Sequence, residues 1–504
     1  MAKNLFSRME SALVEIGAKK PLAGGRTEGT KTSSAKLPSK GKVKRYILTS
    51  AQNNTMVNEP LWRNLLALAK HYSAEVLVGT YSYNQNAYGK LAVKAGTKKT
   101  RDHELWFDPC LKEYISDKRI ELAPGLVWCG EMNILPTAGD PLSGLETYAH
   151  RKSAIFPHAK LAMRSVATMK GEGAKLNYTT GTVTLMNYIQ KKEGLKAEHH
   201  HTYAFLVVEV NHAGNWWVRQ VGAGKGGRQI QDLNVLMEDG AVTSTKAYVE
   251  AITWGDLHAT ISDPTTVAAS IDMLNQLEPQ VQFLHDVLEG VTINHHSAKD
   301  PHTRFKNHLR GLSVLSEELR RTLEVVKKYL RKATRTVVVD SNHDSAWILR
   351  WLREHDYRTD PANAILFLEV QLEVYKALEC GDEKFHVLEW AMSKFGIDPS
   401  VQFLRQDESF TICGKKIECG MHGHLGPNGA RGTPANLNKI GRRANTAHTH
   451  SCGIYNGLYV AGTTSRLNWD YARGPNSWTH SHVVTYVNGQ RTIVTMYDGK
   501  WRAQ

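Results

Sequence analysis

Cysteine is scarce in this chain, with six residues in 504, and their spacing is irregular. A disulfide framework is therefore excluded as the basis of the fold, and reduced thiols in a cytoplasm are expected. No apolar run reaches the roughly 18 residues that a membrane-spanning helix needs. The first residues also lack the apolar stretch of a secretory signal. We therefore expect a cytoplasmic protein without a membrane segment.

Positive charge is in excess and is concentrated at the N-terminus. The formal net charge is +14, and residues 1–45 hold 11 basic and 3 acidic side chains, a net of +8. Residues 18–44 are rich in Gly, Ser, Thr and Lys and show no apolar periodicity. These patterns predict a basic, flexible leader over residues 1–44. Such a leader either attracts a polyanion, nucleic acid above all, or is only a solvated tail.

The rest of the chain divides into two parts that differ in the order of their expected strands and helices. Residues 45–246 predict a mixed α+β domain of unknown role, with strands at 45–50 and 74–83 around a helix at 60–72. Residues 247–504 follow a strand, polar turn, helix order that predicts an α/β domain. Its strands include VQFLHDVL and TVVVD, and a helix is expected over residues 264–277. Helical insertions are expected at about 300–335 and 345–395, the first as one helix over 302–332.

Polar side chains follow the apolar strands of the second part in a regular way. In α/β sheets, sites form at the carboxyl ends of strands. Imidazoles and carboxylates are ligands that suit Mn²⁺, Fe and Zn, and a carboxylate can bridge two such ions. The sequence therefore predicts a site that holds two divalent ions. The candidate residues, in chain order, are Asp256, His258, Asp286, Asn342, His343, Asp344, His422, His424, His448 and His450.

The segments GDLHA, LHDVLEG, DSNHD, MHGHL and AHTHS occur in this order between residues 255 and 451. In both content and order they resemble the signature of the calcineurin-like metallophosphoesterase superfamily. The resemblance covers about half the chain, residues 247–504. It implies that this part is a metallophosphoesterase β-sandwich flanked by helices, which the mixed α+β domain precedes. It also implies two divalent ions, preferentially Mn²⁺, with Fe, Zn or Mg²⁺ as alternatives.

The resemblance also implies a role for each residue. Asp256, His258 and His450 would hold the first ion, and Asp286 would bridge both. Asn342, His422 and His448 would hold the second ion. His343 would act on the substrate phosphate as a catalytic residue, and Asp344 would orient it. His424 would lie outside the ligand set.

Three positions depart from the family pattern. His285, Ser341 and Ala447 stand where the family has glycine before Asp286, Asn342 and His448. The tight turns that glycine permits must then be made in another way. Asp286 lies in the least typical motif, and His285, Asp300 and Asp340 are the nearby alternatives to it.

The substrate expected from the resemblance is DNA. The basic leader favours the DNA-nuclease, SbcD-like branch, as do Arg431, Arg442 and Arg443, which lie between two ligand motifs where phosphates would approach. The domain order resembles phage-encoded early nucleases that degrade or help transfer DNA, which would act in the host cytoplasm. A homo-oligomer, a dimer or larger, is expected. The alternatives are a phosphomonoesterase or nucleotide phosphodiesterase, and a DNA-binding scaffold with a vestigial metal site.

Overall fold

The computed structural model describes residues 32–83, 106–470 and 472–504. Most of the predicted leader, residues 1–31, lies outside the described part. Within the remainder, Ser33–Ser34 form strand β1, which pairs in parallel with β4. The chain divides into two compact units. Unit 2 comprises Ala167–Ala174 and Tyr248–Trp501, and the other described residues form unit 1.

Unit 1 contains a seven-stranded sheet in the order β13-β12-β11-β10-β9-β2-β3. Helix α2 (Glu59–Tyr72) connects the parallel strands β2 and β3, as the sequence predicts. Asn58 caps this helix by accepting the Leu61 amide, and Pro60 occupies its first turn. The strands are β2 (Lys44–Gln52), β3 (Glu75–Tyr81), β9 (Ala204–Val210), β10 (Trp216–Gly224), β11 (Gln229–Asp232), β12 (Val235–Glu238) and β13 (Ala241–Ser244).

Further strands of unit 1 run in the order β1-β4-β5-β6-β8-β7. Helix α4 (Lys192–His200) follows them in the chain. In the β-rich run TTGTVTLMNY, Thr179 ends β8, and Gly181, Thr182 and Thr184 form isolated β-bridges. The strands are β4 (Arg119–Ala123), β5 (Leu126–Cys129), β6 (Ser153–Phe156), β7 (Met163–Val166) and β8 (Lys175–Thr179).

Unit 2 is built on a six-stranded sheet in the order β17-β16-β15-β14-β23-β24. Strands β14 to β17 are parallel to one another, and β23 joins β14 in antiparallel pairing. Parallel order places the carboxyl ends of β14, β15 and β16 at one edge of the sheet. The strands are β14 (Ala251–Thr253), β15 (Val281–Leu284), β16 (Arg335–Val338), β17 (Gln402–Phe403), β23 (Ser481–Thr485) and β24 (Arg491–Thr495).

A second group of strands in unit 2 runs in the order β21-β22-β20-β19-β18. Ala251, Phe283 and Val337 of the first sheet share a buried cluster with Ile412 and Ile417 of this group. The two sets of strands therefore pack face to face around one core. The strands are β18 (Thr411–Ile412), β19 (Ile417–Glu418), β20 (Ala444–Thr446), β21 (Gly453–Tyr455) and β22 (Leu458–Val460).

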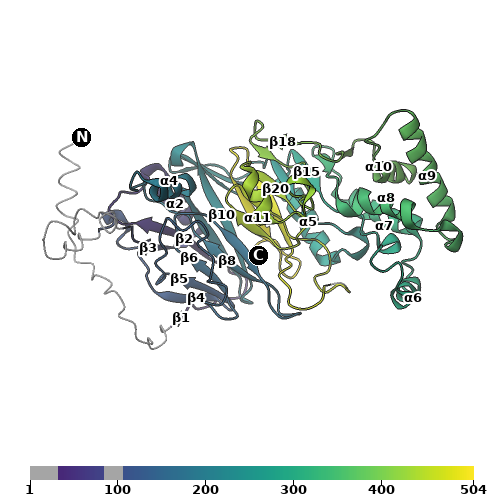
Figure 1. Ribbon diagram of the computed structural model, residues 1–504. Helices are drawn as coiled ribbons and strands as arrows, with labels where there is room; N and C mark the ends of the chain where they lie inside the picture. The colour runs from purple at the N-terminus through teal and green to yellow at the C-terminus, as the bar shows by residue number, and fades with distance from the viewer. Residues whose placement is uncertain (1–31, 84–105, 471) are drawn as a thin grey trace, which may run out of the picture. The chain divides into compact units, whose positions relative to one another are not determined.

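Helices α5 to α10 belong to unit 2, and α6 to α10 form the green part of the ribbon in Figure 1. Helix α5 has its predicted bounds, because Asp263 caps it and Pro264 occupies its first turn. The single helix expected over 302–332 is wrong: Gly311 adopts φ +67° and separates α6 from α7. The helices are α5 (Pro264–Leu277), α6 (Pro301–Leu309), α7 (Leu315–Tyr329), α8 (Trp347–Glu354), α9 (Ala364–Glu379) and α10 (Val387–Lys394).

The expected class, a mixed α/β protein with several sheets, is confirmed. In the part of the chain that the structure describes, every helix is too short or too polar to cross a membrane.

His482 on β23 is a buried histidine that stabilises the turn after β14. Its Nδ1 accepts the amide of Gly255, the residue before Asp256, at 2.9 Å. Burial first, and then the neighbouring His480, lower the pKa of His482 to about 3. An unfolded histidine has a pKa of about 6.5. Between these values the unfolded chain binds the extra proton, so unfolding becomes easier as pH falls.

We therefore expect the free energy of unfolding of unit 2 to fall by about 1–2 kcal/mol between pH 7 and pH 5 through His482 alone. His482→Asn keeps an acceptor for the Gly255 amide but removes the titration. Urea unfolding followed by tryptophan fluorescence at several pH values should show a shallower pH dependence for this variant. Equal slopes for the variant and the unchanged protein would contradict the expectation.

Candidate metal centre

The turns after β14 and β15 bring the first candidate ligands together. Asp256 and His258 follow β14, and Asp286 follows β15. The amide of His258 donates to the Asp286 carbonyl oxygen at 2.7 Å, which joins the two turns directly. Gly255 is required here, because a Cβ at this position would lie 2.6 Å from the Gly462 backbone. The local sequence thus allows two backbones to approach closely beside the candidate ligands.

Asp256, His258 and His450 form the first cluster, and their side-chain ligand atoms all lie within 4.8 Å of one another. His450 Nε2 lies 2.9 Å from Asp256 Oδ2 and 3.0 Å from His258 Nε2. All three residues are buried. They are the residues that the resemblance implies for the first ion, brought from positions up to 194 apart in the chain.

Asp286, His422 and His448 form a second cluster by the same distance criterion. Asp286 Oδ2 lies 3.3 Å from His422 Nε2 and 3.7 Å from His258 Nε2. One carboxylate oxygen of Asp286 therefore lies between the two clusters. This is the position that a bridging ligand requires.

Asn342, the remaining candidate ligand, follows β16 at the same edge of the sheet as Asp286. Among the described residues, neither its Oδ1 nor Asp286 Oδ1 finds a hydrogen-bond partner, although both atoms are buried. Burying an unpaired polar oxygen costs about 1–3 kcal/mol. Native proteins keep such atoms mainly where a function or an ion needs them. The buried oxygens and imidazoles therefore fit divalent ions, and Mn²⁺, Fe and Zn accept this donor set.

Four candidate ligands hold a left-handed backbone that favours glycine. The φ angles are +41° at His258, +42° at Asp286, +70° at His448 and +57° at His450. A non-glycine residue in this region costs of order 1 kcal/mol, and such strain collects at functional sites. At Asp286 and His448 the candidate ligand itself has the left-handed conformation, and His285 and Ala447 before them do not.

At the second cluster, carboxylates and imidazoles shift one another's pKa values. Burial opposes ionisation of Asp286, but the imidazoles of His422 and His343 outweigh it and hold the pKa of Asp286 well below its usual range. Burial also opposes protonation of His422, but Asp286 and Asp256 raise its pKa to about 9. Two carboxylates thus concentrate negative charge on one imidazole, which is the charge pattern that a cation would satisfy.

His343 and Asp344 lie in a π-helical turn, Asn342–Ala346, directly before α8. The ring of His343 stacks on Trp347 with centroids 3.8 Å apart and meets the His258 ring edge-on at 4.8 Å. Its Nδ1 lies 2.8 Å from the Glu289 carbonyl oxygen. The expected partner, Asp344, instead accepts the amide of Leu288 at 2.9 Å. The prediction that Asp344 orients His343 is therefore corrected: Asp344 holds the backbone that follows Asp286.

Glu289 is a residue of the centre that the sequence analysis missed. It is buried, and its Oε2 lies 2.7 Å from His258 Nδ1. Glu289, His258 and His343 form a third group of ligand atoms within 4.8 Å. A carboxylate beside a ligating imidazole fixes its orientation and raises its basicity. The only signal in the sequence was its place three residues after Asp286 in HDVLEG.

The alternative ligands lie in other places. His285 is buried with its Nδ1 3.3 Å from His422 Nδ1, so it contacts a member of the second cluster. Asp300 caps α6 by accepting the His302 amide at 3.0 Å. Asp340 lies 3.5 Å from His386 and lines a pocket beside the second cluster. His424 contacts the rings of His422 and His448 at the same pocket.

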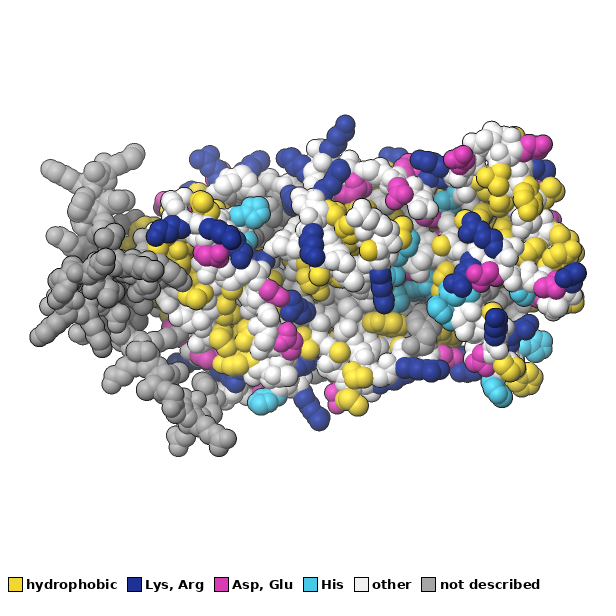
Figure 2. All heavy atoms as spheres, in the orientation of Figure 1, with side chains coloured by type: hydrophobic (Ala, Val, Ile, Leu, Met, Phe, Trp, Pro, Cys, Tyr) yellow, Lys and Arg dark blue, Asp and Glu magenta, His cyan; other side chains and the backbone are white. Residues whose placement is uncertain are grey.

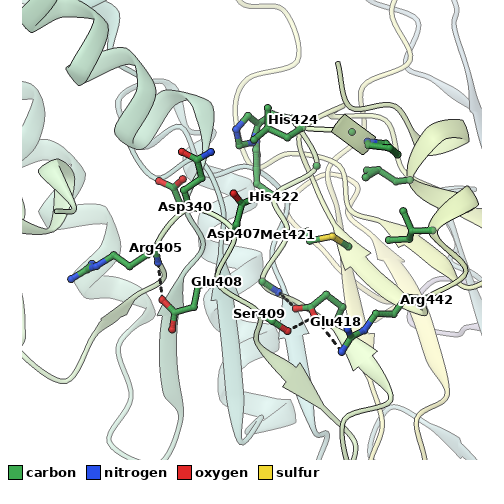
Figure 3. Close-up of a pocket in the computed structure, with 18 residues that line it drawn as sticks. Asp340, Arg405, Asp407, Glu408, Ser409, Glu418, Met421, His422, His424 and Arg442 are labelled. Carbon is green, nitrogen blue, oxygen red and sulfur yellow. Dashed lines mark hydrogen bonds and ion pairs between the residues drawn. The ribbon is translucent and has the colours of Figure 1, made fainter. Parts of the chain in front are cut away.

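The pocket, with a volume of about 420 Å³, opens beside His422 and His424 (Figure 3). Arg442 lines it and lies 3.5 Å from Glu418. Of the three arginines expected to meet phosphate, Arg442 is the one that lines this pocket. Arg431 is exposed outside its lining, and the Arg443 guanidinium donates to the Gly489 carbonyl. Arg443 is thereby held by the fold, which argues against a phosphate contact.

Glu318 on α7 supports both ligand turns from outside the clusters. Its carboxylate accepts the amides of Val291 at 2.9 Å and Thr292 at 3.0 Å, and the hydroxyl of Thr260 at 3.2 Å. Thr260 follows His258 by two residues, and Val291 follows Asp286 by five. Glu318 is buried and thus ties the two turns together.

Glu318→Gln should lower the free energy of unfolding by about 1–3 kcal/mol. The glutamine amide nitrogen replaces one accepting oxygen and then faces a buried N–H group that has lost its acceptor. Mn²⁺ affinity should fall about 10-fold or more, as for other residues that support ligands. Glu317→Gln is a matched control, since Glu317 is the exposed neighbour on the same helix. Isothermal titration with Mn²⁺ and urea unfolding measure both effects, and equal behaviour of the two variants would show that Glu318 does not support the ligand turns.

Together the fold and the site define an α/β protein with a buried histidine and carboxylate centre suited to divalent ions. The chain is 36% identical to Protein A1 of Escherichia phage T5 over 473 residues, which covers 91% of this chain and 83% of that protein. It belongs to the same family as that phage protein. No protein-family model matches the sequence. A solved structure that matches 49% of this chain has 8% identity and a TM-score of 0.26, too low to inform the fold.

Proposed function

We propose that the protein is a phage-encoded two-metal phosphodiesterase that hydrolyses the DNA backbone in the cytoplasm of the host cell. The observation that carries the proposal is the position of Asp286 Oδ2, within 3.3 Å of His422 Nε2 and 3.7 Å of His258 Nε2. A carboxylate oxygen shared by two histidine clusters is the arrangement that a two-metal hydrolase needs. The two packed strand layers of unit 2 are consistent with the sandwich of the calcineurin-like metallophosphoesterases.

The residues of the candidate metal centre would have different roles in hydrolysis. Asp256, His258 and His450 would hold one ion, and Asn342, His422 and His448 the other, with Asp286 shared. Two ions held in this way would supply an activated water and neutralise charge on the phosphoryl group. Glu289 fixes the imidazole of His258, and Asp344 fixes the backbone after Asp286.

His343 is the residue suited to handle a proton at the leaving oxygen. Its Nδ1 faces the Glu289 carbonyl oxygen and therefore donates, which leaves Nε2 as the site for the transferred proton. Burial lowers the pKa of His343, partly offset by Asp286. A bound phosphate would favour the protonated ring, because an adjacent negative charge raises the pKa of an imidazole.

DNA is proposed as the substrate because the chain is basic overall and an arginine lies at the pocket beside the candidate centre. Arg442 lines the pocket beside His422 and His424, and the chain carries a net charge of +14. Neutralising several phosphates supplies most non-specific DNA affinity and makes it salt-dependent. The acidic residues Asp340, Asp407 and Glu408 also line the pocket, and Glu418 pairs with Arg442, so we expect the phosphate to contact the pocket on its Arg442 side.

The test uses the full-length protein with Mn²⁺ or with EDTA. Linear duplex, circular duplex and single-stranded DNA are compared with a chromogenic phosphomonoester. We expect cleavage of DNA with Mn²⁺ and none with EDTA. Turnover of the monoester alone would show that the substrate is a small phosphomonoester and not DNA. Bound metal without any turnover would favour a DNA-binding scaffold.

A further inference from the structure

Helix α9 (Ala364–Glu379) carries apolar side chains on two opposite faces. Leu366, Phe367 and Val370 are buried on the inner face. Phe367 meets Trp351 of α8 edge-on, with ring centroids 4.9 Å apart. The inner face therefore attaches α9 to the helices of unit 2. This packing accounts for only part of the apolar surface of the helix.

The outer face of α9 consists of five large apolar residues that are open to solvent. Their spacing of three or four places them along one stripe of the helix. Figure 2 shows hydrophobic side chains gathered on the surface where Figure 1 places α9. The residues, with their exposed fractions, are Ile365 (75%), Leu368 (48%), Leu372 (52%), Tyr375 (63%) and Leu378 (54%).

A helix that is apolar on both faces is normally covered on both. Five side chains, each about half exposed or more, offer roughly 500 Å² of apolar area, which is in the range of functional patches. Two copies of this patch would bury about 1,000 Å² together, the lower limit for a specific interface. The outer face is thus large enough for self-association.

The charges on α9 show which partner fits. The helix carries Glu369, Glu373 and Glu379 against Lys376 alone, a net charge of −2. This sign disfavours DNA and anionic lipid, both of which need basic residues. Glu369 and Lys376 are seven residues apart and so occupy the same position of the heptad that flanks the apolar stripe.

We propose that the outer face of α9 binds the same face of a second copy, with the two helices antiparallel and crossing near Leu372. In this orientation equivalent heptad positions face each other, so Glu369 meets Lys376 of the partner subunit, and the pair occurs twice by symmetry. A parallel arrangement brings no such opposite charges together. Within one copy Glu369 pairs with Lys394 and Lys376 with Glu373, both partly exposed contacts that exchange at little cost.

Light scattering coupled to size-exclusion chromatography tests the proposal on the full-length protein. The unchanged protein should have the mass of two copies or a multiple of two. Leu372→Glu places two carboxylates at the crossing point and should raise the dissociation constant of this contact at least about 100-fold. Leu309→Glu is the matched control, because Leu309 is 70% exposed on α6 and should leave the mass unchanged.

A charge exchange tests the orientation separately. Glu369→Lys alone should weaken association, since it places Lys opposite Lys, and Glu369→Lys combined with Lys376→Glu should restore it. Circular dichroism checks that every variant stays folded. A monomeric unchanged protein at tens of micromolar would overturn the proposal. The proposal would also be overturned if the Leu372→Glu variant were folded and kept the mass of the assembly. The same holds if that variant lost DNA binding but kept its mass.

Discussion

Asp286→Asn is expected to lower kcat/KM for Mn²⁺-dependent DNA hydrolysis by at least about 1,000-fold, beyond the ~10–100-fold typical of residues that only support ligands. Asp286 Oδ2 lies between the two clusters, and the substitution replaces one of its two charged oxygens with an amide nitrogen that cannot ligate. Metal content should fall from two ions toward one or none. Steady-state kinetics and metal analysis on the same sample measure both effects.

Asp300→Asn is the matched control for this variant. Asp300 was a competing ligand in the sequence, but in the structure it caps α6, a role that asparagine also fills. It should keep full activity and both ions. If Asp286→Asn retained both ions and most activity, the shared-carboxylate account would be wrong. If Asp300→Asn lost them instead, the ligand assignment would be wrong.

His343→Ala is expected to keep both ions and to lower kcat about 100- to 10,000-fold, the usual contribution of a positioned proton donor. The Nδ1 contact to the Glu289 carbonyl and the stack on Trp347 hold the ring beside His258 without making it part of the first two clusters. A substrate with a leaving group that needs no proton should be affected much less.

The third group of ligand atoms, His258, Glu289 and His343, offers an alternative role for His343, that of a metal ligand. If His343 holds an ion, then His343→Ala should lose metal together with activity. The loss of activity should then be the same whether or not the leaving group needs a proton. His308→Ala, a change on the surface of α6, serves as the control and should alter neither measurement.

Local signals in the sequence predict the parts of the fold where caps and periodicity agree. Helix α5 begins at Pro264 after the Asp263 cap, and strands β2 and β3 surround α2 as expected. The strand predicted as VQFLHDVL ends at Leu284, because Asp286 adopts a left-handed turn. The break at Gly311 was missed because apolar periodicity continues across it.

The site was predictable as a set of residues but not as a set of contacts. The resemblance carried by the motifs from Asp256 to His450 implies which side chains converge. Asp256, Asp286 and Asn342 follow parallel strands whose carboxyl ends lie at one edge of a sheet. No pattern in the sequence indicates that Asp344 turns to the backbone or that Glu289 lies against His258. Those contacts depend on how the turns after β15 and β16 pack, which local sequence does not determine.

Anomalous diffraction from crystals grown with Mn²⁺ tests the central claim most directly. We predict two peaks about 3.5–4 Å apart. One should lie among Asp256, His258 and His450, the other among Asn342, His422 and His448, and both within ligand distance of Asp286. A single peak, two peaks that Asp286 does not join, or no peak at these residues would contradict the two-metal account.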